Sequence, residues 1–225
     1  MREGFAAVVT TRIYCHQGCS ARPKPENVVR YATAAEAERA GFRACKRCRP
    51  DRPIRFDVGR CSLGALLVAA SPGGLCAVLL GESVEELAAD LRSRFPMALL
   101  VRGDVSAQLA AVTRLVDAPR SGLEVPLDAH GSPFQERVWR ELRAIPVGST
   151  ASYGEIAARL GDRSLSREVG RALGANPFPL VVPCHRVLAA GGKTGGFSAP
   201  GGVSTKLRLL EIERARVPGV PTLFR

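Results

Sequence analysis

Residues 152–188 have the sequence "SYGEIAARLGDRSLSREVGRALGANPFPLVVPCHRVL", and this stretch decides the fold of the second half of the chain. Its first part, residues 153–175, contains two short amphipathic segments joined by a tight polar turn. That pattern predicts a helix-turn-helix, whose second helix usually meets nucleic acid. Asn176 and Pro177 then end the second helix, and an apolar run leads to a cysteine.

That cysteine, Cys184, stands between Pro183 and the pair His185–Arg186. A buried free cysteine usually acts as a small hydrophobic side chain, so a packing role is one interpretation. A thiol becomes a nucleophile when a base lowers its pKa and a third group orients that base. His185 and the later Glu213 offer those two groups. On residue types alone, a hydrolase with a Cys-His-acid relay is therefore a second interpretation.

The segments on either side of this stretch predict a mixed α/β architecture. Residues 132–145 carry apolar side chains at helical spacing, and residues 206–216 predict a last amphipathic helix that contains Glu213. Residues 61–81 predict a β-hairpin around the turn "SPGG". A helix capped by Ser83 is expected next, followed by loops to about residue 130.

Four cysteines near the N-terminus form two close pairs, Cys15/Cys19 and Cys45/Cys48, separated by 25 residues. Two chelating pairs of soft thiolates are what a tetrahedral structural zinc ion requires. A segment of about 50 residues needs a stabilising metal site of this kind, because it is too small to fold on an apolar core alone. An iron–sulfur cluster is the alternative. We expect His16 to be a surface residue and not a ligand.

The composition points to a polyanionic partner in a reducing compartment. The net charge is +11, and residues 1–55 contain 12 Lys/Arg against five Asp/Glu, which favours nucleic acid. Seven cysteines without a secretory signal favour metal or thiol chemistry over disulfides, so we expect a cytoplasmic protein. The apolar runs are too short to span a bilayer. We expect Cys61 and Cys76 to fill the core.

Residues 10–50, "TTRIYCHQGCSARPKPENVVRYATAAEAERAGFRACKRCRP", resemble the N-terminal domain of the Ada-type DNA repair proteins. The resemblance implies a Zn²⁺ ion with the ligands Cys15, Cys19, Cys45 and Cys48. It also implies that Cys15 irreversibly accepts a methyl group from a methylphosphotriester in DNA. Basic residues nearby would hold the flanking phosphates, namely Arg22, Lys24, Arg43, Lys46 and Arg47. Under ten residues separate Cys48 from the start of the expected β-rich part at residue 53, so we expect no regulatory helix-turn-helix pair there and no dedicated promoter binding.

The motif "PCHRV", with "GANPFPLVV" before it, "SYGEIA" upstream and "GGFS" downstream, resembles the O6-alkylguanine-DNA alkyltransferases. The resemblance covers roughly residues 55–215. It implies that Cys184 accepts the alkyl group and that His185 activates the thiol through a water. It further implies that Glu213 orients the imidazole and that Asn176 braces the turn before the active-site segment.

An alkylated base inside a duplex must be flipped out before a thiol can reach it. The same resemblance implies that Arg167 enters the stack where the base has left and that Tyr153 assists the rotation. The residues implied for the base pocket are Tyr153, Val187, Phe197 and Ser198. A tyrosine is common in the family at the position of Phe197, so a hydroxyl contact would be lost there.

Together these observations predict an α/β (α+β) DNA repair protein with three parts. They are a zinc domain (1–52), a β-rich subdomain (53–128) and a DNA-binding, active-site domain (129–220). The expected partner is double-stranded DNA carrying alkylated bases, O6-alkylguanine and possibly O4-methylthymine, or phosphotriesters. No membrane partner is expected, and the protein is expected to be a monomer. The alternative is a zinc-dependent DNA-binding module with an inactive alkyltransferase domain.

Overall fold

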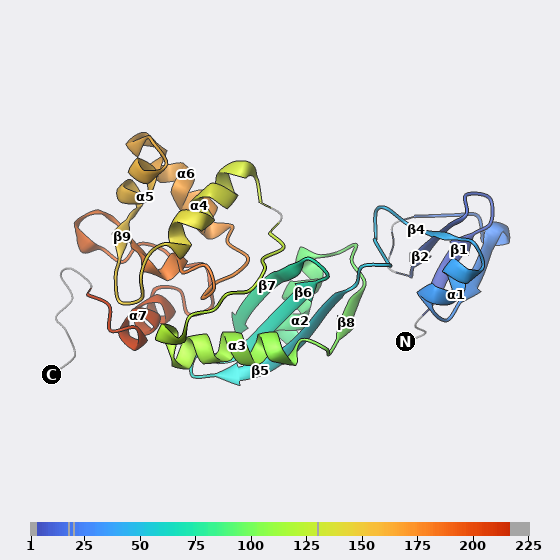
Figure 1. The fold of residues 1–225 in the computed structure, drawn as a ribbon, viewed down its shortest axis with the longest axis horizontal. Helices are drawn as coiled ribbons and strands as arrows, with labels where there is room; N and C mark the ends of the chain where they lie inside the picture. Colours follow the sequence, from blue (N-terminus) through green and yellow to red (C-terminus); the bar gives the residue numbers. More distant parts are fainter. Residues whose placement is uncertain (1–3, 18, 20, 130, 217–225) are drawn as a thin grey trace.

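The computed structural model describes residues 4–17, 19, 21–129 and 131–216. Figure 1 shows three successive parts: a small N-terminal unit, a sheet with helices, and a mainly helical part. The mixed α/β class is confirmed. No helix within the described ranges is long and apolar enough to cross a membrane. The outermost residues of the expected domains, 1–3 and 217–220, lie outside the described residues.

The N-terminal unit is a four-stranded sheet with one helix. Its strands are β1 (Phe5–Val8), β2 (Ile13–His16), β3 (Val28–Tyr31) and β4 (Arg43–Ala44), in the order β3-β1-β2-β4. A 3₁₀ turn at Pro25–Asn27 precedes β3, and helix α1 (Ala34–Arg39) starts from a capping box between Thr33 and Glu36. The fully apolar core of this unit is very small, consisting of Ala7, Tyr14, Ala37 and Phe42.

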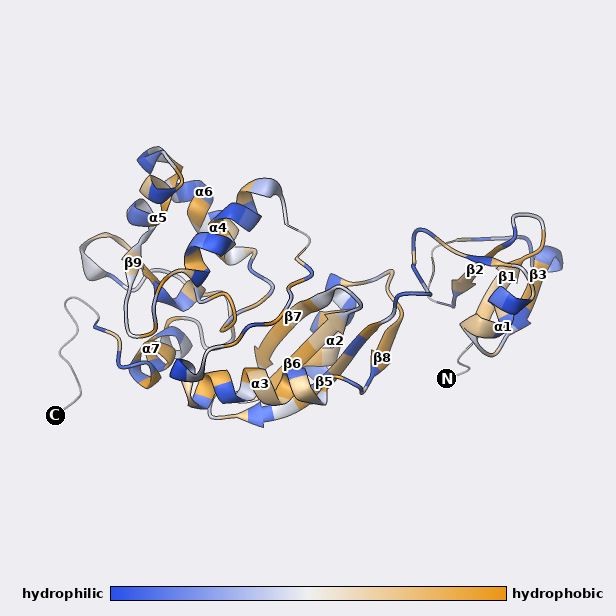
Figure 2. Cartoon of the chain, viewed as in Figure 1, coloured by the Kyte–Doolittle hydropathy of each residue, from blue (hydrophilic) through white to orange (hydrophobic). Residues whose placement is uncertain are grey.

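The middle part is a four-stranded sheet with a helix on each face. Its strands are β5 (Ile54–Cys61), β6 (Gly64–Ser71), β7 (Gly74–Gly81) and β8 (Leu100–Arg102), in the order β7-β6-β5-β8. Helix α2 (Val84–Arg94) covers one face and α3 (Ser106–Asp117) the other. Alternate β6 residues therefore enter different cores: Leu66 packs with Val112 of α3, and Leu67 with Leu87 of α2. This explains why β6 and β7 are apolar along their length, as Figure 2 shows.

The hairpin of β6 and β7 and the Ser83 cap of α2 are confirmed, but the expected loop-rich segment up to residue 130 is wrong. It contains β8, α3 and a 3₁₀ turn at Pro119–Ser121. Leu109, Val112 and Val116 lie at helical spacing in a stretch rich in alanine, so a buried face was present in the sequence. Strand β8 pairs in parallel with β5, a non-local contact that no local pattern reports.

The C-terminal part carries the helix-turn-helix, which is confirmed as α5 and α6. Its helices are α4 (Pro133–Arg143), α5 (Tyr153–Arg159), α6 (Ser166–Gly174) and α7 (Val203–Ile212). Two short parallel strands, β9 (Ala151–Ser152) and β10 (Val187–Leu188), pair beside them. Further 3₁₀ turns lie at Arg163–Leu165, Cys184–Arg186 and Ala190–Gly192. Val138, Leu142 and Ile145 are buried, which confirms the predicted apolar face of α4.

One continuous core joins the sheet to the helical part and fixes the segment that carries Cys184. The amide of Val78, on the edge strand β7, donates a hydrogen bond to the carbonyl of Pro177 at 2.9 Å. The Trp139 indole of α4 donates to the Ala172 carbonyl of α6 at 2.9 Å, and its ring lies edge-on to Phe178. The chain between α6 and Cys184 is therefore held on both sides.

Candidate active site and zinc centre

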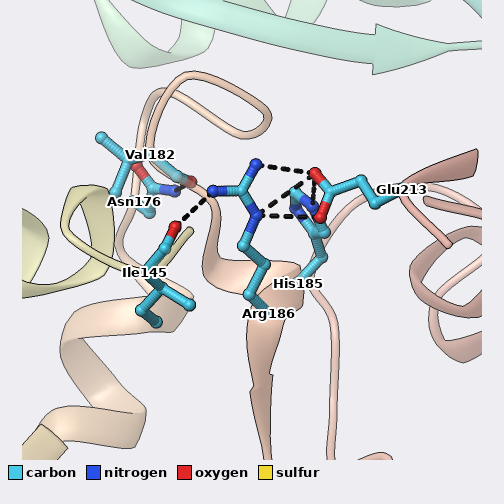
Figure 3. A network of polar contacts seen from close by, with 6 residues as sticks. All are labelled: Ile145, Asn176, Val182, His185, Arg186 and Glu213. Carbon is cyan, nitrogen blue, oxygen red and sulfur yellow. Dashed lines mark hydrogen bonds and ion pairs between the residues drawn. The ribbon is translucent and has the colours of Figure 1, made fainter. Parts of the chain in front are cut away.

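Cys184 is the first residue of a 3₁₀ turn that follows Pro183, and only 5% of its surface is exposed. Asn176 fixes the segment before it. The Asn176 Nδ2 donates to the Val182 carbonyl at 2.9 Å, while its Oδ1 accepts from the Phe178 amide at 3.0 Å. The buried asparagine thus closes the loop on itself and fixes the segment that leads to Cys184. Figure 3 shows Asn176 beside Val182.

His185 and Glu213 lie in direct contact behind the cysteine. The His185 Nε2 lies 2.9 Å from Glu213 Oε1, and both side chains are almost fully buried. Arg186 holds the same carboxylate with two nitrogens, Nε at 2.9 Å from Oε2 and Nη2 at 2.7 Å from Oε1. Its Nη1 donates to the Ile145 carbonyl at 2.6 Å. Figure 3 shows the carboxylate between the imidazole and the guanidinium.

This arrangement determines the protonation states of the relay. Although burial opposes ionisation, hydrogen bonds from His185 and Arg186 lower the pKa of Glu213 to about 2, so it is a carboxylate at neutral pH. Burial lowers the pKa of His185, which therefore stays neutral. A neutral imidazole that donates from Nε2 to the carboxylate has a free lone pair on Nδ1. That Nδ1 atom is buried and has no hydrogen-bond partner among the described residues.

Glu213 was expected inside the last helix, and this expectation is wrong. Helix α7 ends at Ile212, and Glu213 is its C-cap residue. The chain turns directly afterwards, with Arg214 in the left-handed region at φ 53°. The C-cap position directs the carboxylate toward the 3₁₀ turn of Cys184 instead of along the helix face.

The residues predicted for the base pocket and for base flipping come from α5, α6, β10 and the loop that follows β10. Tyr153 is the first residue of α5, and a Cβ added at Gly195 would lie 3.3 Å from its ring and hydroxyl. Val187 is fully buried in β10. Phe197 is half-buried and Ser198 exposed, while Arg167 is exposed on α6.

The four N-terminal cysteines converge on one point. Cys15 lies on β2 and Cys19 shortly after it, and the pairing of β2 with β4 brings Cys45 and Cys48 alongside. The Cys45 amide donates to the Tyr14 carbonyl at 2.9 Å. The four sulfur atoms all lie within 4.8 Å of one another.

Comparisons with known proteins match both centres. Residues 133–215 match the family "6-O-methylguanine DNA methyltransferase, DNA binding domain", and residues 3–51 match "Metal binding domain of Ada". The inducible methylated-DNA–protein-cysteine methyltransferase of Bacillus subtilis is 40% identical over 133 residues, which cover 58% of this chain and 73% of that protein. The crystal structure of Mycobacterium tuberculosis OGT in complex with DNA has a TM-score of 0.60 at 34% identity, covering 76% of this chain and 99% of that one.

The chain belongs to the methylated-DNA–protein-cysteine methyltransferase family. It is also 37% identical over 162 residues to the bifunctional transcriptional activator/DNA repair enzyme Ada of Escherichia coli, which covers 71% of this chain. That match spans 45% of the Ada protein, and the match to the Mycobacterium tuberculosis methyltransferase, at 50% identity, spans 60% of that relative. The chain thus spans about half the length of these curated relatives.

The cysteine cluster of this chain fits zinc. Tetrahedral Zn–S bonds of about 2.3 Å place the sulfur atoms about 3.8 Å apart, which agrees with the observed convergence. Burial and the neighbouring sulfurs raise the pKa of Cys15, and they raise that of Cys48 to about 12. A divalent cation is what makes four thiolates compatible at neutral pH. His16 is not in the ligand set, as expected, but it is half-buried and its Nε2 lies 2.9 Å from the Met97 carbonyl.

Basic side chains border the cluster on one side. A cleft of about 880 Å³ is lined by Cys15 and Cys19 together with five basic residues, Arg22, Lys24, Arg43, Lys46 and Arg47. A second cleft of about 540 Å³ is also lined by Cys15 and Cys19. Cys15 therefore lines two clefts, although only 6% of the residue is exposed.

Sequence reasoning missed two charged residues of the methyltransferase site. Arg186, which contacts Glu213, belongs to the motif "PCHRV", but no role was predicted for it from the sequence. Lys206 of α7 is completely buried, and its Nζ donates to the Val187 carbonyl at 2.5 Å. Burial lowers the pKa of Lys206 to about 8. Burial also raises the pKa of Cys184, while the Asn176 hydrogen bond and the Lys206 charge act against this rise. The sequence did contain one indication of the burial of Lys206, because this residue lies on the same helix face as Leu209 and Leu210.

Proposed function

We propose that this chain repairs duplex DNA by transferring the alkyl group of O6-alkylguanine irreversibly to Cys184. The observation that carries the proposal is the free Nδ1 of His185 beside a cysteine whose position is fixed by Asn176. A buried imidazole with one nitrogen bound to a carboxylate and the other free is arranged to accept a proton. A structural thiol would need none of these groups.

The reaction balances with the groups present. The Cys184 thiol gives its proton to His185 Nδ1, through a water as the family resemblance implies, and Glu213 with Arg186 steadies the resulting imidazolium. The thiolate Sγ attacks the alkyl carbon, so a C–S bond forms as the C–O6 bond breaks. The electron pair leaves with guanine, which takes up the proton from the relay. The thioether is permanent, so each molecule reacts once.

Access to the base requires flipping it out of the duplex, at a cost of a few kcal/mol. Within this proposal the exposed Arg167 of α6 fills the gap in the stack, and Tyr153 guides the rotating nucleotide. Val187, Phe197 and Ser198 would then border the extrahelical base. We also propose duplex DNA with damaged bases as the partner, a monomeric protein, and the division into parts at residues 1–52, 53–128 and 129–220. The separate small core of the first part supports the first boundary.

We further propose a second transfer, from methylphosphotriesters of the DNA backbone to Cys15. Two observations favour it: Cys15 borders both clefts at the cluster, and basic side chains line one of them. Arg22, Lys46 and Arg47 would bind the phosphates on either side of the triester. Zn²⁺, when bound, keeps the sulfur deprotonated at neutral pH.

The primary test is stoichiometric labelling. The protein is incubated with duplex DNA that contains one O6-methylguanine, and its peptides are analysed by mass. The expected result is one added methyl group on Cys184, at no more than one per chain, and none in a Cys184→Ser variant. A Cys76→Ser variant is the matched control, because it removes another buried thiol. Repeated turnover would support a hydrolase instead, and DNA binding without an adduct would support an inactive module.

The second transfer is tested in the Cys184→Ser background with DNA that carries a methylphosphotriester and no damaged base. The expected result is a methyl group on Cys15 and one zinc per chain, with the zinc lost in Cys45→Ser. Methylation of a different cysteine, or of none, would remove Cys15 from this role without affecting the proposal for Cys184.

A further inference from the structure

A cavity of about 300 Å³ extends from Cys184 to the middle part of the molecule. One side is formed by the active-site segment and by residues 198–200 of the following loop. The opposite side is formed by residues 78–80 of β7 and by Asp90 and Arg94 of α2. Of the residues proposed to contact the base, Ser198 lines it, while Tyr153, Val187 and Phe197 do not. The cavity therefore adjoins the space proposed for the base at Ser198 and extends from there to α2.

A methyl group needs only a small part of this space. Cavities of about 150 Å³ in protein cores accommodate benzene. The lining near Cys184 combines the apolar Pro179 and Ala199 with the polar but uncharged Asn176 and Ser198, so Asp90 and Arg94 are the charged residues among those that line the cavity. Larger O6 substituents can extend toward α2 without displacing the thiol.

The far wall carries the one ion pair among the residues that line this cavity. Arg94 Nε donates to Asp90 Oδ1 at 3.0 Å, and Arg94 Nη2 donates to Asp90 Oδ2 at 2.9 Å. The two side chains are 42% and 43% exposed. A guanidinium has more N–H donors than this pairing uses, and no partner for Arg94 Nη1 is recorded within the described part of the chain. The pair thus holds a cation at the end of the cavity with spare donors.

We propose that Arg94 and Asp90 determine which alkyl groups this chain accepts, with Arg94 favouring O6 substituents that end in a carboxylate. The carboxymethyl group is the smallest such substituent. Burying its negative charge in a partly enclosed cavity is costly unless a charged donor pairs with it. Arg94 supplies that donor, and Asp90 both positions the guanidinium and repels the incoming carboxylate. Transfer follows the same chemistry as for methyl, with the CH₂ carbon attacked and the carboxylate carried along.

This inference rests on the proposed transfer to Cys184, so the test measures two substrates side by side. Single-turnover rates are measured with duplexes that contain O6-methylguanine or O6-carboxymethylguanine, and adducts on Cys184 are identified by peptide mass. The wild type is expected to react with both. The decisive quantity is the ratio of the carboxymethyl rate to the methyl rate, because effects on folding or DNA binding cancel in it.

Three variants are expected to change this ratio in different ways: one lowers it, one raises it and one leaves it unchanged. Arg94→Ala is expected to lower the ratio about fivefold, since a half-exposed charged hydrogen bond is lost. Asp90→Asn is expected to raise it, because the repelling charge is removed while Arg94 remains. Arg92→Ala is the matched control: it removes the same charge from an exposed position of the same helix that does not line the cavity. Its ratio is expected to equal that of the wild type.

The outcomes separate the two proposals. If the wild type transfers methyl but its ratio is the same in Arg94→Ala and Arg92→Ala, the selectivity role is overturned and the repair function stands. Failure of the wild type to accept carboxymethyl while it accepts methyl overturns the inference as well. If neither group is transferred, the proposed function itself fails.

Discussion

The two cysteine centres of this chain solve the same problem with different means. At the N-terminal cluster, four sulfurs lie within 4.8 Å of one another in a unit with a very small apolar core. At the other centre, one sulfur lies in the main core beside a histidine, a carboxylate and a buried lysine. A thiolate cannot persist in a buried place unless its charge is compensated. Zn²⁺ compensates the charge at the first centre, and within the proposed function the protonated His185 does so at the second.

This difference has a structural consequence. The cluster holds its unit together, so chemistry and folding depend on the same ion there. Cys184 lies instead in a core that is formed by the sheet and several helices, so the packing around it does not involve a metal ion. The comparison therefore predicts that damage to one centre spreads through its whole unit, while damage to the other stays local.

The largest expected effect comes from removing zinc. With excess chelator, residues 5–44 of the N-terminal unit are expected to lose their amide-exchange protection, because structural zinc contributes on the order of 10 kcal/mol to folding such units. Transfer to Cys184 should stay within about twofold of the untreated protein, since its core does not include the cluster. A parallel loss of Cys184 transfer would show that the two centres are not separate and would break the comparison.

The next effect concerns Glu213. Glu213→Gln removes the carboxylate that holds His185 and leaves the Arg186 charge buried. Transfer to Cys184 is expected to fall about a hundredfold. The lowered pKa of Glu213 contributes its full stabilisation above pH 4.5, and this contribution is lost as the pH falls toward 2. The unfolding free energy of the wild type should therefore decrease by about 3 kcal/mol over this range. This acid-dependent loss should be absent in the variant.

Glu211→Gln is the matched control for this prediction. Glu211 lies two residues earlier, and its carboxylate accepts from exposed Arg208 at 2.9 Å. Surface pairs of this kind contribute little to stability. Equal acid sensitivity in Glu211→Gln and Glu213→Gln would contradict the assignment of the stabilising charge to Glu213.

Local patterns were sufficient for much of this architecture. The spacing of the two cysteine pairs, the turn "SPGG" and the apolar face of α4 are short-range features, and the structure confirms the cluster, the hairpin and the helix. The roles of Cys184, His185 and Cys15 came from the family resemblance and stay predictions. The features that were not predicted depend on non-local contacts. Strand β8 pairs with a strand about 45 residues away in the sequence, and α3 packs against the sheet that this pairing extends.

The burial of Lys206 and the C-cap position of Glu213 were not predicted, for a related reason. A lysine within an amphipathic helix normally has its charge in water, so the position of Lys206 on the face of Leu209 and Leu210 did not by itself show that its charge is buried with carbonyl partners. Glu213 was assigned correctly to the neighbourhood of the histidine, but its C-cap position depends on where α7 ends, which sequence patterns locate poorly. Burial of charge is a property of the assembled core, so the sequence could not report it.

Lys206 gives a smaller effect that depends on pH. Its charge favours the Cys184 thiolate, and its own pKa of about 8 means that this help is lost as the pH rises through 8. Lys206→Met should therefore react about tenfold more slowly than the wild type near pH 7, and the two should converge above pH 8. The measurement is the single-turnover rate across pH, with the exposed Lys193→Met as the control for net charge. A constant ratio at all pH values would assign Lys206 a packing role only.

The smallest expected effect lies where the two regions touch. Met97, which follows α2, packs against the cysteine cluster, and its carbonyl lies 2.9 Å from His16 Nε2. Met97→Ala keeps that carbonyl but removes the half-buried side chain. Local opening of residues 13–16 and 43–48 should become easier by about 1 kcal/mol, since partly buried side chains contribute less than core ones. Amide exchange measures this opening, and Val84→Ala, an exposed change at the start of the same helix, should leave it unaffected. Because Arg94 lies one turn before Met97, a changed rate at Cys184 in Met97→Ala would mean that α2 links the metal centre to the alkyl cavity. An unchanged rate with weakened protection would show that the two centres touch and still react independently.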